Sequence, residues 1–150
     1  MNAGPSYAVG LAETVYIDAH AILAADSLHG GAHNMLGKLN YEIMSLSWFE
    51  RMVAKAFLGN DALHDTSWEN AEYHLRRAVD TWPDFILFHF DLGQLHRKRG
   101  RQEHAIEAFR QALTLKAVHP IDKRLQNQAR EILAEWGVPT ESTSEMPTGR

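Results

Sequence analysis

FHFDLGQLHRKRGRQEHAIEAFRQAL, residues 88–113, carries two apolar patterns of helical period that are separated by Gly100. Gly93 lies in the first pattern, Ala105 follows it by twelve residues, and Phe109 follows Ala105 by four. Glycine and alanine at such positions let two antiparallel helices approach closely, while larger residues fill the space between them. The stretch therefore predicts a pair of packed helices.

The preceding residues repeat the second half of this pattern. Ala71, Leu75 and Ala78 are spaced by four and three, and Pro83 follows Ala78 by five. Gly93 follows Pro83 by ten, which places both blocks in one repeat register. The spacing resembles the tetratricopeptide repeat (TPR). The resemblance implies an all-α fold in which antiparallel helix pairs form a superhelix.

An insertion interrupts the repeat that comes before. Gly37 precedes Ala71 by 34 residues, which is 22 more than the corresponding distance from glycine to alanine in the first block. The difference indicates an insertion at about 45–66 between the two helices of one repeat. We expect about 2.5 TPR-like repeats, close to the minimum for stability, with residues 7–26 as the second helix of a degenerate first repeat.

The apolar periodicity also predicts where each helix begins and ends. The last helix is polar on one face and is expected to cap the superhelix. Residues 1–136 are expected to form one domain, and residues 137–150, rich in Pro, Thr, Ser, Glu and Gly, a flexible tail. The expected helices are 7–26, 32–44, 48–58, 67–81, 84–99, 102–117 and 121–136.

The composition is that of an ordinary soluble protein, with 45% apolar and 23% charged residues. The absence of cysteine excludes disulfides, thiolate zinc sites, thiol nucleophiles and covalent haem attachment. A formal net charge of −4 gives no basic footprint for nucleic acid. No apolar stretch is long enough to span a membrane and no signal-peptide pattern is present, which favours a cytoplasmic protein.

HNMLGKLNYEIMSLSWFERMVAKAFLG, residues 33–59, resembles a signature of the regulator of microtubule dynamics family. The likeness continues through SWENAEYHLRRAVDTWP, residues 67–83, and covers about 20–135. It implies a TPR-like interaction module without a reaction, whose eukaryotic relatives are associated with microtubules, or with membrane contact sites and lipid binding. The positions of the signature and of the repeat register that we single out are His33, Gly37, Glu42, Trp48, Glu50, Arg51 and Gly93.

The nine histidines are the unusual feature of the composition. His89 and His96 lie seven residues apart on one predicted helix face, with Asp91 nearby. A metal site would need a third ligand at a spacing of three or four, as in HExxH, and the sequence has none there. We therefore expect both histidines to pack within the helix pair, and we expect no metal or other cofactor. His33 is expected to hydrogen-bond to the neighbouring helix.

Three charged residues lie within otherwise apolar helices. Such residues usually pair when they are partly buried, so Glu42, Glu50 and Arg51 predict a Glu–Arg pair that holds the inserted helix against the repeat. A polar anchor for a ligand is the alternative. Two carboxylates also suggest acid–base catalysis, but no nucleophile, oxyanion donor or cofactor site accompanies them. We therefore expect that the protein is not an enzyme.

By resemblance to TPR modules, ligands would lie in the groove lined by the first helix of each pair. An apolar and basic mixture there suits an extended or helical peptide of acidic character. The familiar basic clamp for a peptide carboxylate is incomplete, because Phe90 stands where a lysine is expected. For Leu87 and Phe90, packing against a neighbouring helix remains an open alternative. The expected groove residues are Asn34, Lys38, Tyr41, Leu87, Phe90, Gln94, Arg97 and Lys98.

The insertion carries an apolar stripe of Trp48, Phe49, Met52 and Phe57. We expect these side chains to pack in the core; the alternative, which the family resemblance permits, is that they line an apolar cavity for a lipid chain. The sequence thus predicts a non-enzymatic scaffold for protein–protein interaction, self-association or assembly into a larger complex. A lipid-binding or membrane-contact module is the alternative function.

Overall fold

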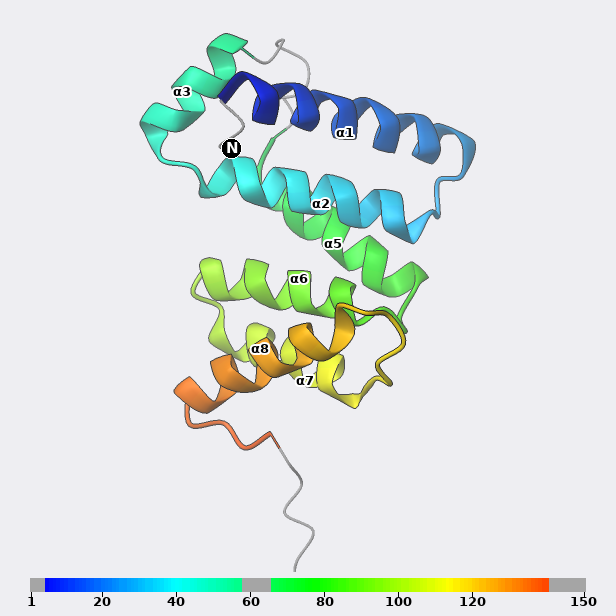
Figure 1. Ribbon diagram of the computed structural model, residues 1–150, viewed down its shortest axis with the longest axis vertical. Coiled ribbons are helices and arrows are strands. Elements are labelled where there is room, and N and C mark those ends of the chain that lie inside the picture. The colour runs from blue at the N-terminus through cyan, green and yellow to red at the C-terminus, as the bar shows by residue number, and fades with distance from the viewer. Residues whose placement is uncertain (1–4, 58–65, 141–150) are drawn as a thin grey trace, which may run out of the picture.

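The computed structural model describes residues 5–57 and 66–140 (Figure 1). Within these residues every regular element is an α-helix, and turns or short loops connect the helices. Residues 58–65, which belong to the expected insertion at about 45–66, and residues 141–150 of the expected tail lie outside the described residues. The helices are α1 Pro5–Ala25, α2 Gly30–Ser45, α3 Trp48–Phe57, α5 Trp68–Thr81, α6 Ile86–Lys98, α7 Gln102–Thr114 and α8 Asp122–Glu135.

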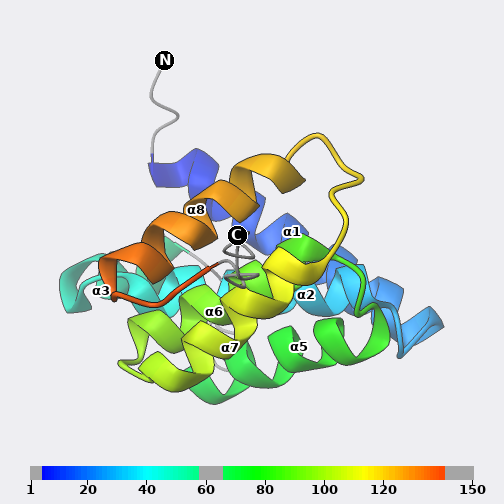
Figure 2. The same cartoon turned by 90° about the horizontal axis from the view of Figure 1, so that it is seen from below.

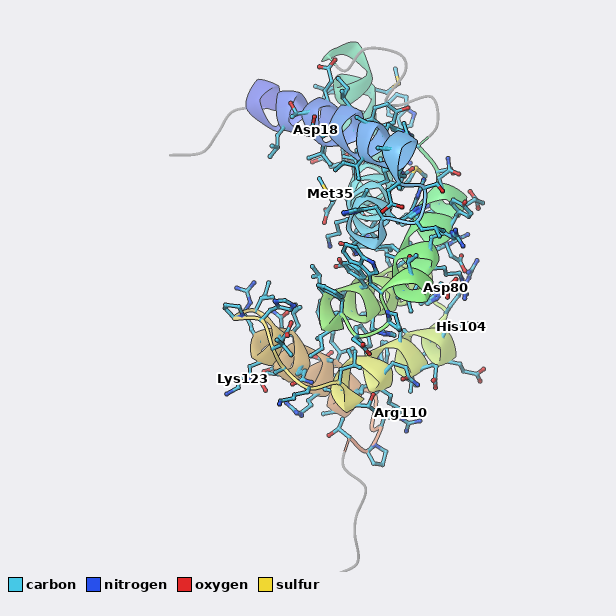
Figure 3. All side chains as sticks on the ribbon, turned by 90° about the vertical axis from the view of Figure 1, so that its right-hand side faces the viewer. Asp18, Met35, Asp80, His104, Arg110 and Lys123 are labelled. Atoms are coloured by element: carbon cyan, nitrogen blue, oxygen red, sulfur yellow. The ribbon has the colours of Figure 1, made fainter. Side chains whose placement is uncertain are left out.

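The helices follow an arc, which Figure 3 shows from the side. α2 and α6 lie toward the concave side of the arc, whereas α5 and α7 lie on its outer side. α1 packs against α2 at one end, and α8 packs against α6 and α7 at the other. Figure 2, seen from the α8 end, shows this last group of three helices together.

Two glycines set the closest approaches between helices. A Cβ atom at Gly37 of α2 would lie 2.6 Å from Cγ of Leu75 in α5, and one at Gly93 of α6 would lie 2.6 Å from Cε1 of Phe109 in α7. No real side chain tolerates such a distance, so each site needs glycine. The pairing of α2 with α5 across the intervening α3 agrees with the insertion expected from the sequence.

Four expected helix ends differ from the structure by two residues or more: α1 begins at Pro5 rather than at 7, α2 begins at Gly30 rather than at 32, and the start of α6 and the end of α7 also differ. The Ser67 hydroxyl caps α5 by accepting a hydrogen bond from the backbone N–H of Asn70. The expectation that a helix begins at Asp84 is wrong, because Phe85 is still extended and α6 begins at Ile86. The helix expected to reach residue 117 ends at Thr114, because Leu115 turns to an extended conformation.

The buried apolar cluster of the C-terminal helices is larger than the one between α1 and α2. The α6–α8 cluster consists of the buried residues Ile86, Phe90, Ala105, Phe109, Ala112, Leu125, Ala129, Ile132 and Leu133. Between α1 and α2 the buried cluster comprises Ala19, Ala32 and Leu36. The contact between α1 and α2 therefore buries fewer large apolar side chains than the α6–α8 group does.

Candidate partner-binding site

A hollow of about 320 Å³ lies between the C-terminal parts of α2 and α6. Its lining residues are Tyr41 from α2 and Gln94, Arg97 and Lys98 from α6. The spacing of three and four places the α6 residues on one helix face. All four were expected in the groove from the sequence, and the structure brings them together. We call this site the α2–α6 hollow.

A buried carboxylate links the two helices beside the hollow. Asp91 of α6 accepts a hydrogen bond from the Asn34 side-chain amide at 3.1 Å, and its other oxygen lies 3.5 Å from the Lys38 ammonium. Lys38 also lies 3.2 Å from Glu42 and stands over the Tyr41 ring. Asn34 is thus a buried link between the helices, while Lys38 positions Tyr41 at the wall of the hollow.

Burial and charge act in opposite directions on this link. Burial raises the pKa of the Asp91 carboxyl above its ordinary value, and the attraction of Lys38 with the Asn34 hydrogen bond offsets this only in part. Burial alone would lower the pKa of Lys38, but the carboxylates of Asp91 and Glu42 together raise it. Lys38 therefore stays protonated, and its charge is largely compensated within the chain.

The two cations of α6 are more available. The Arg97 guanidinium lies 3.7 Å from the exposed Glu135 carboxylate and 6.0 Å from the centre of the Trp136 ring. Such a solvent-exposed ion pair is weak, at about 0–1 kcal/mol. Within the described part of the chain, Lys98 forms no ion pair. The hollow therefore presents positive charge that a ligand can engage.

Arg97 also lines a second hollow of about 160 Å³, together with Gly100, Gln102 and Trp136. The two hollows share Arg97, so they form neighbouring parts of one surface. The sequence prediction missed Trp136. Its position at the C-terminal end of the last apolar helix pattern, just before Gly137, was the available signal.

Four of the eight expected groove residues do not line the hollow, namely Asn34, Lys38, Leu87 and Phe90, and of these Asn34 and Phe90 are buried. Phe90 is only 6% exposed, and its ring lies 5.6 Å from that of Phe109, centre to centre. Leu87 packs against the same α6–α8 cluster. For both residues the structure supports the alternative of packing against neighbouring helices, because they face α7 and α8 across a well-filled apolar core.

Three histidines, His33, His89 and His96, are buried within the helix pairs. Nδ1 of His33 and Nδ1 of His74 lie 2.9 Å apart, and Nε2 of His33 lies 3.1 Å from the Ser27 carbonyl oxygen, so the expected hydrogen bond from His33 to the next helix is present. His89 lies 2.7 Å from the Pro83 carbonyl oxygen, and His96 is buried. Within residues 5–57 and 66–140 no three His, Asp or Glu side chains gather as a metal site.

The charged residues near α3 are arranged differently from our expectation, and no Glu–Arg pair holds the helix in the described part of the chain. Glu50 accepts a hydrogen bond from the Ser47 backbone N–H at 2.8 Å, and its own backbone N–H donates to the Ser47 hydroxyl at 3.3 Å. Hydrogen bonding to Ser47 lowers the pKa of the Glu50 carboxyl. This is a capping box at the start of α3. Arg51 donates to the Met44 sulfur, and Glu42 pairs with Lys38.

The expected core packing of the α3 stripe is also wrong for three of its residues. Trp48 is 70% exposed, Phe49 is 69% exposed and Met52 is 50% exposed. These three side chains project from α3 into solvent, so they do not line an enclosed cavity either. The side chain of Phe57 lies outside the described residues. The periodic pattern identified the helix, but it could not distinguish a buried face from an exposed one.

Comparison with known proteins gives one clear result. The family model of regulator of microtubule dynamics protein 1-3 matches residues 19–137, which is most of the chain. The chain belongs to the regulator of microtubule dynamics family. The matched region of this family extends from the second half of α1 through α8, so it includes the α2–α6 hollow and the exposed α3. No curated protein sequence matches the chain.

One further observation concerns membranes. None of the helices in the described residues combines the length and the apolar character that crossing a bilayer requires.

Proposed function

We propose that this member of the regulator of microtubule dynamics family is a TPR-like scaffold without enzymatic activity. It binds an extended, acidic segment of a partner protein in the α2–α6 hollow. The observation that carries the proposal is that Tyr41, Gln94, Arg97 and Lys98 line one hollow and that Lys98 has no ion pair in the described part of the chain.

The chemistry of the hollow supports an acidic segment. Arg97 donates in a planar fork that matches a carboxylate, and Lys98 adds a mobile positive charge. The Tyr41 ring offers an apolar surface, and the Gln94 amide can bond a peptide backbone. A peptide carboxylate that approaches Arg97 competes only with the exposed Glu135, which lies at 3.7 Å. Such a site favours binding over reaction, because these four residues provide no activated nucleophile.

A peptide array tests the proposal directly. Peptides rich in Asp and Glu are displayed beside peptides in which these residues are replaced by Asn and Gln, and the purified protein is applied to both. We expect binding to the acidic set that weakens as salt is raised. Arg97→Glu combined with Lys98→Glu should reduce the affinity for the best peptide by about tenfold or more.

The matched control reverses two cations that lie away from the hollow. Arg110 and Lys116 are exposed, and neither lines the α2–α6 hollow, so Arg110→Glu with Lys116→Glu changes the net charge equally. The control should bind the best peptide almost as the unaltered protein does. Equal losses in both variants, or no loss in the first, would contradict binding in the hollow. Circular dichroism checks that each variant folds.

A second candidate function rests on the exposed face of α3. Trp48, Phe49 and Met52 on a short amphipathic helix, with Arg51 beside them, have the character of a segment that lies in a membrane interface. Sedimentation with vesicles of mixed neutral and anionic lipid is the test. If α3 binds membranes, Trp48→Ser with Phe49→Ser should abolish co-sedimentation; if the unaltered protein stays in the supernatant, this candidate fails.

A further inference from the structure

The outer face of α1 carries exposed apolar side chains. α1 packs mainly on α2, and Leu11 and Ile17 on its other side are 55% and 57% exposed. Glu13 stands one turn before Ile17 on one side of the exposed surface of α1, and Asp18 stands two turns after Leu11 on the other side. We call Leu11, Glu13, Ile17 and Asp18 the α1 face.

The α1 face belongs to a part of the chain that has no positive charge from Lys or Arg. Residues 1–37 contain Glu13, Asp18 and Asp26 but no lysine or arginine. Glu13 and Asp18 are exposed, and within the described part of the chain neither forms an ion pair. The face therefore carries two exposed apolar side chains and two carboxylates, and no ion pair among the described residues offsets their charge.

The opposite end of the arc has the complementary character. Val118 in the turn before α8 is 74% exposed and Ile121 is 37% exposed. Lys123 and Arg124 follow directly, are exposed, and form no ion pair with any other described residue. We call Val118, Ile121, Lys123 and Arg124 the α8 face.

The acidic residue in this segment does not offset those cations at the surface. Asp122 is buried, and its Oδ2 accepts the backbone N–H groups of Val118 at 2.8 Å and His119 at 2.7 Å. Its charge is thus used to hold the turn. Figure 3 labels Asp18 on α1 and Lys123 on α8, at the two ends of the arc.

We propose that the α1 face binds the α8 face of a second copy of this chain, in a head-to-tail contact. Each face offers two exposed apolar side chains, and the charges beside them are negative on one and positive on the other. Pairing of two α1 faces would instead bring Glu13 and Asp18 against the same carboxylates. A head-to-tail contact is not symmetric, so it joins copies into chains or closed rings. The contact does not involve the α2–α6 hollow.

Two charge-reversed variants test the contact. The first is Glu13→Lys with Asp18→Lys, which makes the α1 face positive; the second is Lys123→Glu with Arg124→Glu, which makes the α8 face negative. All four residues are exposed, so the fold should survive, and circular dichroism checks this. The mass is measured by analytical ultracentrifugation up to about 1 mM protein, at about 0.05 M and about 0.5 M salt.

We expect the unaltered chain to gain mass with concentration at low salt and each variant alone to stay monomeric, with a Kd weakened by about tenfold or more. An equimolar mixture of the two variants should associate again, because its faces are once more opposite in charge. A monomeric unaltered chain at the highest concentration, or a mixture that stays monomeric, overturns the proposal. Association of the second variant alone would indicate contact between two α1 faces and also overturns it.

The test is separate from that of the proposed function. Arg97→Glu with Lys98→Glu should associate like the unaltered chain, because neither residue lies in the α1 face or the α8 face. Each face variant should still bind the best acidic peptide. Loss of peptide binding with retained self-association, or the reverse, therefore shows which of the two proposals fails.

Discussion

The contact between α2 and α5 differs in chemistry from the contact between α6 and α7, although each centres on a glycine. In the first, Gly37 lies against Leu75 and the histidines His33 and His74 meet nearby. In the second, Gly93 lies against the Phe109 ring, which belongs to a cluster of nine buried residues. A histidine pair also meets at the second contact, where the rings of His96 and His104 lie 5.2 Å apart, centre to centre. The two contacts therefore differ in the apolar group against the glycine, which is an aliphatic side chain in a cluster of five buried residues at Leu75 and an aromatic ring in a cluster of nine at Phe109.

This difference separates the helices that contribute most to stability from the surfaces that are available for interaction. The C-terminal helices gain stability from apolar area and can therefore carry exposed cations at Arg97 and Lys98 beside the hollow. The N-terminal helices bury fewer large apolar residues, and their exposed apolar side chains lie on α1 and α3. Stability should therefore respond most strongly to changes in α6–α8, and interactions to changes on the surfaces of α1, α3 and α6.

The largest effect is expected from Phe109→Ala. The side chain is fully buried beneath Gly93 and Phe90, so its loss leaves a cavity that should lower the free energy of unfolding by about 3–5 kcal/mol. Urea unfolding followed by circular dichroism measures it. Phe109→Leu should cost clearly less, and a loss below about 1 kcal/mol for Phe109→Ala would show that α6 and α7 are held differently.

The next effect compares the two glycines. A Cβ atom at Gly37 would lie 2.9 Å from the Leu75 backbone nitrogen as well as near its side chain, whereas one at Gly93 meets only the Phe109 ring among its nearest atoms. Backbone cannot move aside as a ring can. We expect Gly37→Ala to lower the free energy of unfolding by about 1–3 kcal/mol and Gly93→Ala to lower it less. The reverse order would contradict the comparison.

Acid should weaken both contacts through one histidine in each. Burial, with the neighbouring His33 and His20, lowers the pKa of His74 from 6.5 to about 4. Burial also lowers the pKa of His96 to about 4, against the opposing attraction of Glu72. The unfolded chain then binds protons between pH 6.5 and 4 that the folded chain does not, so stability is full above pH 6.5 and falls through this window.

The size of this acid effect is about 1 kcal/mol for each histidine once solvent screening is allowed for. Urea unfolding at a series of pH values measures it. His74→Gln should flatten the dependence of stability on pH, because it removes one of the two groups that bind protons only in the unfolded chain in this window. An unchanged slope in His74→Gln would mean that His74 takes up its proton in the folded state.

The smallest effect on stability is expected at the exposed face of α3. Because Trp48 and Phe49 project into solvent, Trp48→Ser and Phe49→Ser should each change the free energy of unfolding by no more than about 0.5 kcal/mol. Thermal unfolding of each variant measures it. A decrease in the free energy of unfolding of about 2 kcal/mol or more would show that these side chains pack in the core, as the sequence pattern suggested.

Apolar period and glycine spacing were enough to predict the helices of the described residues and to place Gly37 and Gly93 at close contacts. The helix ends near Asp84 and at 114–117 were harder to predict, because a turn residue such as Asp84 can stand one or two positions before the helix begins. The spacing of three residues from Ser47 to Glu50 is that of a capping box, so the capping role of Glu50 could have been predicted in place of the expected Glu–Arg pair.

The binding surface was predictable only in part. Tyr41, Gln94, Arg97 and Lys98, which repeat register assigned to one groove, line one hollow, but Phe90 shares that register and is buried. Repeat register predicts the helix on which a residue lies. It does not predict which side chains α8 covers, because that depends on how the helices stack. The exposure of Trp48 and Phe49 was not predicted, because an apolar stripe on a helix does not reveal whether another helix packs against it.

Nuclear magnetic resonance of the labelled protein, titrated with the strongest acidic peptide from the array, tests binding in the α2–α6 hollow most directly. We expect the amide signals of Tyr41, Gln94, Arg97 and Lys98 to shift, with smaller changes near Trp136 and none in α3. The shifts should weaken in Arg97→Glu with Lys98→Glu. Shifts confined to α1 or α3, or no shifts at all, would contradict the assignment of this surface to partner binding.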